Sequence, residues 1–159
     1  ANLVSLAAPD ISLICNIGHA HLEFFKDLRG VATEKGDILT GTRNDGTVVI
    51  PGEAVGIDIL RQKAGNRRII TFGTALENDV VAEYLGYCQE NGCFKVRLTW
   101  NPLHESREFF WKIGGAHQAM NAGGAAAVGM ALGLAPDDIV RGLQSDGSNS
   151  ARHSIVRNN

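Results

Sequence analysis

The stretch Asp10-Ile11-Ser12-Leu13-Ile14-Cys15-Asn16-Ile17-Gly18 is a short apolar run that ends in a glycine. A run of this kind is typical of a strand that is buried on both faces of a sheet. Two further strands are expected at residues 46–50 and 68–73, and helices are expected at residues 27–39 and 53–64. Strands that alternate with helices through short connections predict a mostly parallel sheet with crossover helices.

The pattern changes after residue 78, where three strands follow one another without a helix between them. They are expected at residues 80–87, 93–100 and 107–113, and Asn91-Gly92 is a strong hairpin signal between the first two. Residues 93–100 alternate, with apolar side chains at Phe94, Val96, Leu98 and Trp100 and polar ones between them. This alternation predicts an antiparallel meander with one solvent-exposed face.

Two helices complete the expected α/β fold. One is rich in Ala and Gly and covers residues 117–132, and a shorter one begins at Pro136, a residue favoured in the first helical turn. No internal repeat or linker divides the chain, so residues 1–159 are expected to form one unit. The chain starts at Ala1 without Met, and we expect it to be a piece of a longer protein.

Composition excludes several classes of function. The formal net charge is −2, so the basic surface of a general nucleic-acid binder is missing. No apolar run approaches the roughly 20 residues that a membrane span needs. Three cysteines without metal-type spacing do not predict a disulfide framework. These features indicate a protein of a reducing compartment, the cytoplasm.

Lys35 is the most informative single residue. On a helical wheel of residues 27–39 it falls in the middle of the apolar arc that contains Val31, Ala32, Ile38 and Leu39. A lysine in that position either extends its stem so that its ammonium group reaches water, or points into a site that uses it. The residues alone leave both interpretations open.

Two further polar groups stand at positions where ligands often bind. His21 and Glu23 follow the first strand, and ligands of open α/β sheets bind beyond the carboxyl ends of the strands. His117 and Asn121 share one face at the start of the Ala-rich helix. Each pair also has a plain structural interpretation, as a solvated loop and as the polar cap of a closely packed helix.

Taken together, these segments resemble the Mur ligases, the ATP-dependent amide-bond-forming enzymes of peptidoglycan precursor synthesis. The resemblance is carried by Asn16-Ile17-Gly18-His19-Ala20-His21-Leu22-Glu23 and Leu28-Arg29-Gly30-Val31-Ala32-Thr33-Glu34-Lys35-Gly36-Asp37-Ile38-Leu39, at a spacing similar to the family's. A looser match covers Gly115-Ala116-His117-Gln118-Ala119-Met120-Asn121-Ala122 and then Asp137-Asp138-Ile139-Val140-Arg141-Gly142-Leu143. The pattern is most similar to the members that join D-alanyl-D-alanine to a UDP-N-acetylmuramoyl-tripeptide.

The resemblance implies ATP and Mg²⁺ as cofactors and an acyl phosphate intermediate. It implies that His21 is a magnesium ligand and that Lys35 is carbamylated by carbon dioxide. The carboxylate of the carbamylated Lys35 would support a second magnesium ion and help to place the γ-phosphate. It places Asn121, with His117, at the adenine or ribose of the nucleotide. It also matches Arg152 to an arginine near the nucleotide phosphates.

The departures from the family pattern are equally specific. The phosphate-binding Gly-x-x-Gly-Lys-Thr/Ser loop is not in this sequence, nor is an acidic magnesium ligand on a preceding strand, nor a C-terminal domain for the incoming amine. The chain therefore matches the second part of a Mur-ligase central ATP-binding domain, and by itself it is expected to be inactive. Phe25-Lys26-Asp27, Gln118 and Ala151-Arg152 also differ from the commoner family residues.

Other functions stay open at the level of sequence. They are another Mur ligase, a folylpolyglutamate-type ligase, and a non-catalytic α/β binding module that lacks the phosphate loop. A sheet that lacks its first strands would expose an edge, and such edges favour self-association. Residues 145–159 have loop composition, and nothing in them predicts a structure.

Overall fold

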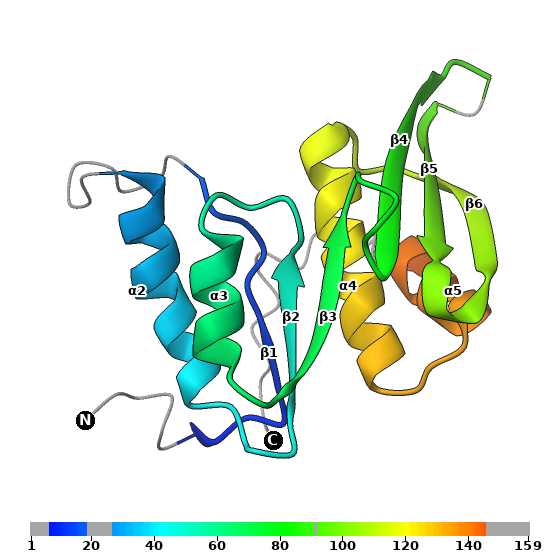
Figure 1. The fold of residues 1–159 in the computed structure, drawn as a ribbon. Coiled ribbons are helices and arrows are strands. Elements are labelled where there is room, and N and C mark those ends of the chain that lie inside the picture. The colour runs from blue at the N-terminus through cyan, green and yellow to red at the C-terminus, as the bar shows by residue number, and fades with distance from the viewer. Residues whose placement is uncertain (1–6, 19–26, 91, 146–159) are drawn as a thin grey trace, which may run out of the picture.

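A computed structural model of the protein describes residues 7–18, 27–90 and 92–145, and its centre is one six-stranded sheet (Figure 1). The strands lie in sequence order, β1 to β6. β1 to β4 pair in parallel, and β4 also begins the antiparallel part, in which it pairs with β5 and β5 with β6. The strands are β1 (Ile11–Leu13), β2 (Thr47–Pro51), β3 (Arg68–Gly73), β4 (Val80–Cys88), β5 (Cys93–Trp100) and β6 (Glu105–Trp111). The predicted combination of a parallel sheet and an antiparallel meander is confirmed.

Helices cover both faces of the parallel part of the sheet (Figure 1). Along β2, Val48 and Ile50 belong to the apolar cluster formed with α2 (Leu28–Thr40) and α3 (Ile57–Ala64). Val49 belongs to the opposite cluster, formed with α4 (Ala116–Ala131) and α5 (Pro136–Ser145). Because successive side chains of a strand point to opposite faces, an apolar run is what a strand covered on both sides requires.

Several element bounds differ from those expected from the sequence. β1 ends at Leu13 rather than near Gly18, and it is the edge strand of the described sheet, where Ile11 and Leu13 are only half-buried. The second helix starts at Ile57 instead of residue 53, because residues 52–56 form turns. The β4–β5 connection comprises residues 89–92, of which Asn91 lies outside the described part of the chain.

β3 and β4 are parallel although only residues 74–79 connect them. They share two residue pairs, Phe72 with Val80 and Gly73 with Val81, so β4 continues beyond the end of β3 and no crossover helix is needed. The Asp79 carboxylate fixes the joint by accepting hydrogen bonds from the backbone N–H of Thr71 (2.7 Å) and from its hydroxyl (3.0 Å). This joint is where the sheet changes from its parallel to its antiparallel part.

The small residues of α4 allow that helix to lie very close to the sheet. A Cβ atom at Gly123 would come within 2.9 Å of the Ala82 Cβ, and one at Gly124 within 3.2 Å of the Phe72 ring. Glycine in a helix interior costs roughly 1 kcal/mol relative to alanine. The close packing of α4 against the sheet explains why glycine stands at both positions despite this cost.

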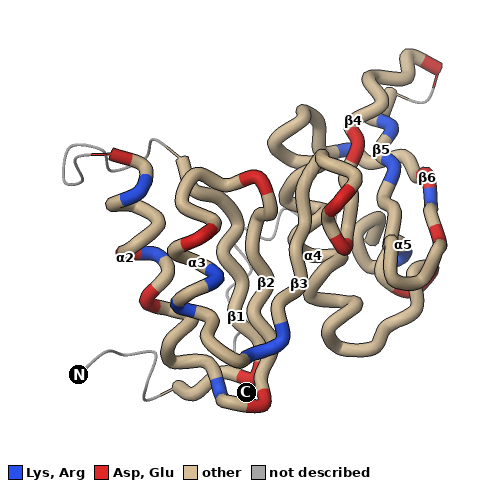
Figure 2. Tube along the Cα trace, viewed as in Figure 1, with Lys and Arg blue, Asp and Glu red and all other residues tan. Residues whose placement is uncertain are grey.

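Acidic and basic residues are mixed on the surface, as Figure 2 shows for α2, α3 and the antiparallel strands. Across β4, β5 and β6, Arg97 pairs with Glu83 (3.1 Å) and Glu108 (2.5 Å), and Lys95 also pairs with Glu108 (2.5 Å). Hydrogen bonds from Lys95 and then Arg97 hold the pKa of Glu108 below its ordinary value. Among the residues that the structure describes, no helix is long and apolar enough to cross a membrane.

Candidate functional site

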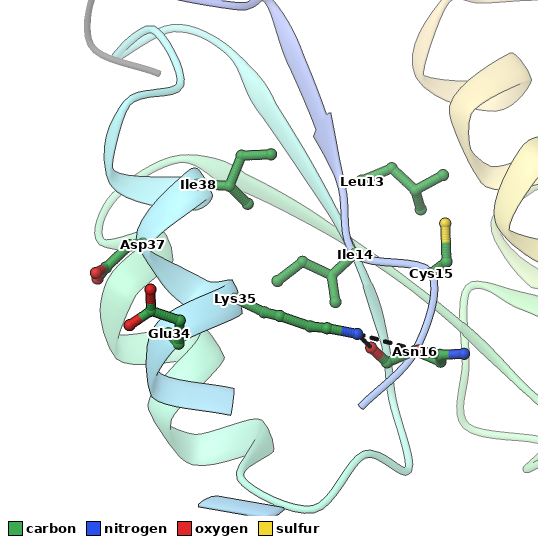
Figure 3. A pocket seen from close by; sticks show the side chains of 8 residues that line it. All are labelled: Leu13, Ile14, Cys15, Asn16, Glu34, Lys35, Asp37 and Ile38. Carbon is green, nitrogen blue, oxygen red and sulfur yellow. Dashed lines mark hydrogen bonds between the residues drawn. The ribbon is translucent and has the colours of Figure 1, made fainter. Parts of the chain in front are cut away.

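Lys35 joins helix α2 to the end of the first strand. Its ammonium group donates hydrogen bonds to the main-chain carbonyl oxygen of Asn16 at 3.0 Å and to the Asn16 side-chain oxygen at 3.2 Å (Figure 3). The side chain is half-buried. It is therefore neither fully extended into water nor fully enclosed in a site, the two alternatives that the helical wheel left open. Lys35 points toward the carboxyl end of β1, and part of it stays in contact with solvent.

The packing of α2 determines this direction. Asp27 caps the helix by accepting a hydrogen bond from the Gly30 N–H at 2.8 Å. Val31, Ala32 and Leu39 are then buried against the sheet, as the wheel predicts, whereas Ile38 is exposed. The buried part of the apolar arc is therefore narrower than predicted, and Lys35 lies at its edge instead of in its middle.

A cavity of about 740 Å³ opens beside Lys35. It is lined by Leu13, Ile14, Cys15, Asn16, Glu34, Lys35, Asp37 and Ile38. Figure 3 shows that Lys35 extends across it to Asn16, while the carboxylates of Glu34 and Asp37 point away from Asn16. Asp37 instead pairs with Lys63 of α3. The cavity therefore presents the Lys35 ammonium group together with the apolar side chains of Leu13, Ile14 and Ile38.

A second cavity, of about 320 Å³, lies on the other side of Asn16. It brings residues 15–17 together with Pro51 and Glu53, which follow β2, and with His117 and Asn121 of α4. The Asn121 amide donates a hydrogen bond to the Gln118 side-chain oxygen at 3.0 Å. Asn16 lines both cavities. Lys35 and the N-terminal end of α4 therefore lie on either side of the residues that follow β1.

Glu53 connects the loops that follow β2 and β3. Its carboxylate accepts hydrogen bonds from the N–H and the hydroxyl of Thr74, both at 2.9 Å, and from the Ala75 N–H. A Cβ at Gly73 would lie 1.8 Å from a Glu53 oxygen, so a larger residue there would displace the Glu53 carboxylate from these hydrogen bonds. Because Glu53 also lines the second cavity, this contact holds the cavity wall in place.

Sequence reasoning missed Asn16 and Glu53 as site residues. Asn16 carried a signal, because it is a polar residue near the end of the first apolar run, where ligands of open α/β sheets bind. Glu53 carried none, since its role depends on a loop more than 20 positions away. His21 and Arg152, which the resemblance singled out, lie outside the described residues. Within the described ranges no group of three or more His, Cys, Asp or Glu side chains is arranged to hold a metal ion.

Comparisons with known proteins agree on one family. The family model "Mur ligase middle domain" matches residues 1–129. The UDP-N-acetylmuramoyl-tripeptide–D-alanyl-D-alanine ligase of Bacillus subtilis is 33% identical over 141 residues, which is 89% of this chain and 29% of that protein. The UDP-N-acetylmuramate–L-alanine ligase of Agathobacter rectalis is 30% identical over 148 residues, 91% of this chain and 31% of that protein.

Solved structures give the same result. A crystal structure of MurF from Acinetobacter baumannii superposes with a TM-score of 0.79 at 26% identity, over 98% of this chain and 33% of that one. A second crystal structure of the same protein gives 0.75 at 27% identity, over 89% of this chain and 30% of that one. The chain thus spans about a third of the length of the relatives that it matches.

Proposed function

This chain belongs to the Mur ligase family, and from that membership we propose that it is part of an ATP-dependent ligase of peptidoglycan precursor synthesis. The proposed reaction joins D-alanyl-D-alanine to a UDP-N-acetylmuramoyl-tripeptide in the cytoplasm. Three relatives from Bacillus subtilis, Haemophilus influenzae and Escherichia coli carry the name of that ligase. The 33% identity to the first of them is the observation that carries the choice of substrate.

A second candidate is a sister ligase that adds L-alanine to UDP-N-acetylmuramate. It is favoured by the 30% identity to the Agathobacter rectalis enzyme. The two candidates differ in the amine and in the acceptor, and both share the ATP-dependent activation of a carboxylate. Offering the complete enzyme each pair of substrates separately distinguishes them.

The surroundings of Lys35 fit the carbamylated lysine that we propose for catalysis. A neutral amine that adds carbon dioxide loses one proton, becomes an anion and keeps one N–H. That N–H can still donate to the Asn16 carbonyl oxygen, now 3.0 Å from the Lys35 nitrogen, while the new carboxylate occupies the 740 Å³ cavity. Carboxylate oxygens are ligands of the type that Mg²⁺ prefers.

In this proposal each residue of the site has a separate task. Carbamylated Lys35 and His21 hold magnesium, which neutralises phosphate charge when bound. Asn121 and His117, near the N-terminal end of α4, contact the adenine or ribose, and Arg152 contacts the phosphates. Asn16 orients Lys35 between the two cavities, because its two oxygens accept from the Lys35 nitrogen.

The direct test is Lys35→Ala in the complete ligase that contains this chain. We expect phosphate release that depends on UDP-N-acetylmuramoyl-tripeptide and D-alanyl-D-alanine to fall at least a hundredfold, with an unchanged circular dichroism spectrum. Lys112→Ala is the matched control, since Lys112 is exposed directly after the end of β6 and lines neither cavity. Full activity of the Lys35 variant would overturn the proposed role.

A further inference from the structure

Cys88 and Cys93 lie directly opposite each other at the end of the β4–β5 hairpin. Cys88 is the last residue of β4, Cys93 is the first residue of β5, and the two form the terminal pair of the antiparallel register. Both are free cysteines and both are half-buried. The hairpin end projects beyond the rest of the sheet (Figure 1), so reagents in solution can reach it.

The register places the Cα atoms of the two cysteines at a separation that a disulfide can span. Directly opposed residues of an antiparallel pair have Cα atoms about 4.5–5.5 Å apart and side chains on the same face of the sheet. Disulfides form across Cα separations of roughly 4.4–6.8 Å. Cys88 and Cys93 therefore need no rearrangement of the strands to become bonded.

The backbone next to the pair can adjust to the geometry of a disulfide. The ladder contains a register shift between Tyr84 and Gly86, and Gly86 and Gly92 have positive φ angles of 104° and 60°. Bulges and glycines of this kind allow a strand to twist locally. The third cysteine, Cys15, follows β1 by two residues and lies outside this ladder.

We propose that Cys88 and Cys93 form a reversible disulfide, which makes the hairpin end a redox modification site. The thiolate of one cysteine attacks oxidised glutathione and releases one molecule of reduced glutathione. The thiolate of the other then displaces the second glutathione from the mixed disulfide. The two cysteines lose two electrons and two protons, and one oxidised glutathione becomes two reduced ones. In a reducing compartment such bonds are usually transient.

Digestion with trypsin provides a direct readout. Both cysteines lie in the single tryptic peptide of residues 69–95, because no Lys or Arg occurs between Arg68 and Lys95. The purified protein that contains this chain is equilibrated with oxidised and reduced glutathione, blocked with N-ethylmaleimide and digested. We expect an unlabelled peptide that is lighter by two hydrogen atoms, and its conversion to a doubly labelled peptide as reduced glutathione is raised.

Two kinds of variant keep the test specific. Cys88→Ser and Cys93→Ser should each leave a peptide that carries glutathione or one maleimide. The double variant Cys93→Ser, Lys95→Cys moves the thiol two residues along the same face, where the diagonal Cα separation of roughly 7–8 Å is too long for a disulfide. Because Lys95 is replaced, its tryptic peptide covers residues 69–97 and ends at Arg97. We expect no internal bond in this variant.

Two results overturn the proposal. One is a wild-type peptide that carries two maleimides or two glutathiones at every glutathione ratio. The other is an internal bond that forms equally well in the register variant, because that result would mean that the hairpin does not set the pairing.

Discussion

The Lys35 ammonium group lies 3.0 Å from the main-chain carbonyl oxygen of Asn16, 19 positions away in the sequence. This contact ties helix α2 to the carboxyl end of β1, the strand end that ligands of open α/β sheets approach. Asn16 also lines the second cavity together with His117 and Asn121. One residue thus connects the two groups of candidate catalytic and nucleotide-binding residues.

Replacing Asn16 by Asp is predicted to oppose carbamylation of Lys35. A carboxylate close to the Lys35 nitrogen stabilises the ammonium form and repels the carbamate. At a charge separation of about 4 Å the repulsion is about 1 kcal/mol or more, roughly a fivefold loss of activity at ambient carbon dioxide. Raising bicarbonate should restore part of the activity of the complete ligase, measured as substrate-dependent phosphate release.

Asn66→Asp is the matched control for this variant. Asn66 is exposed in the turn that precedes β3, so it receives the same added charge away from the two cavities. We expect normal activity and no response to bicarbonate. Wild-type activity of the Asn16 variant at low bicarbonate would contradict the proposed chemistry of Lys35.

Replacing Asn121 by Ala is predicted to weaken nucleotide binding. A lost amide hydrogen bond costs about 0.5–1.5 kcal/mol, so the Kd for a non-hydrolysable ATP analogue should rise about twofold to tenfold. Titration calorimetry on the complete ligase measures it. Gln144→Ala removes an amide that instead donates to the Phe110 carbonyl oxygen, and its Kd should not change. Equal Kd values for both variants would speak against a nucleotide at α4.

Alanine should have opposite effects at two helical glycines. At Gly123 the new Cβ would meet the Ala82 Cβ at 2.9 Å, so we expect a loss of about 1 kcal/mol or more in the free energy of unfolding. At Gly142 in α5 nothing lies within 4 Å, and the better helix propensity of alanine should add about 0.5–1 kcal/mol. Urea denaturation of both variants provides the comparison, and stabilisation by Gly123→Ala would be inconsistent with the close packing of α4 against the sheet.

The ion pairs of Glu108 predict a dependence of stability on pH. Lys95 and Arg97 lower the pKa of Glu108 in the folded state, so the unfolded state takes up a proton first as the pH falls. The stabilisation is fully present above the unfolded pKa of about 4.3, and it is lost as the pH falls through the lower folded value. Glu108→Gln should lower the urea midpoint at pH 7, and this difference should shrink toward pH 3.

Glu90→Gln, on the hairpin loop, is the control for the pH series. Glu90 is exposed and lies outside the ion pairs of β4, β5 and β6. Its variant should follow the wild-type midpoint across the whole range. A difference between Glu108→Gln and wild type that stays constant with pH would show that packing, and not charge, is responsible.

Much of the fold was predictable because its signals are local. The apolar run of β2 and the alternation along β5 depend only on the spacing of side chains on a strand, and both strands lie within one residue of the expected bounds. The first strand was predicted too long because Ile14 to Gly18 continue the apolar pattern, while in the fold only residues 11–13 pair with β2. Which residues of a strand pair with a neighbouring strand cannot be predicted from the sequence of that strand alone.

The sequence by itself determined the order of the elements, the change from parallel to antiparallel strands, and the unusual position of Lys35 on its helix. Only the tertiary structure decided that Lys35 donates to Asn16, that Glu53 holds the loop after β3, and that Cys88 faces Cys93. The physical reason is the range of the interactions. Hydrophobic periodicity acts over a few residues, whereas hydrogen bonds between loops and strand register depend on how distant segments pack.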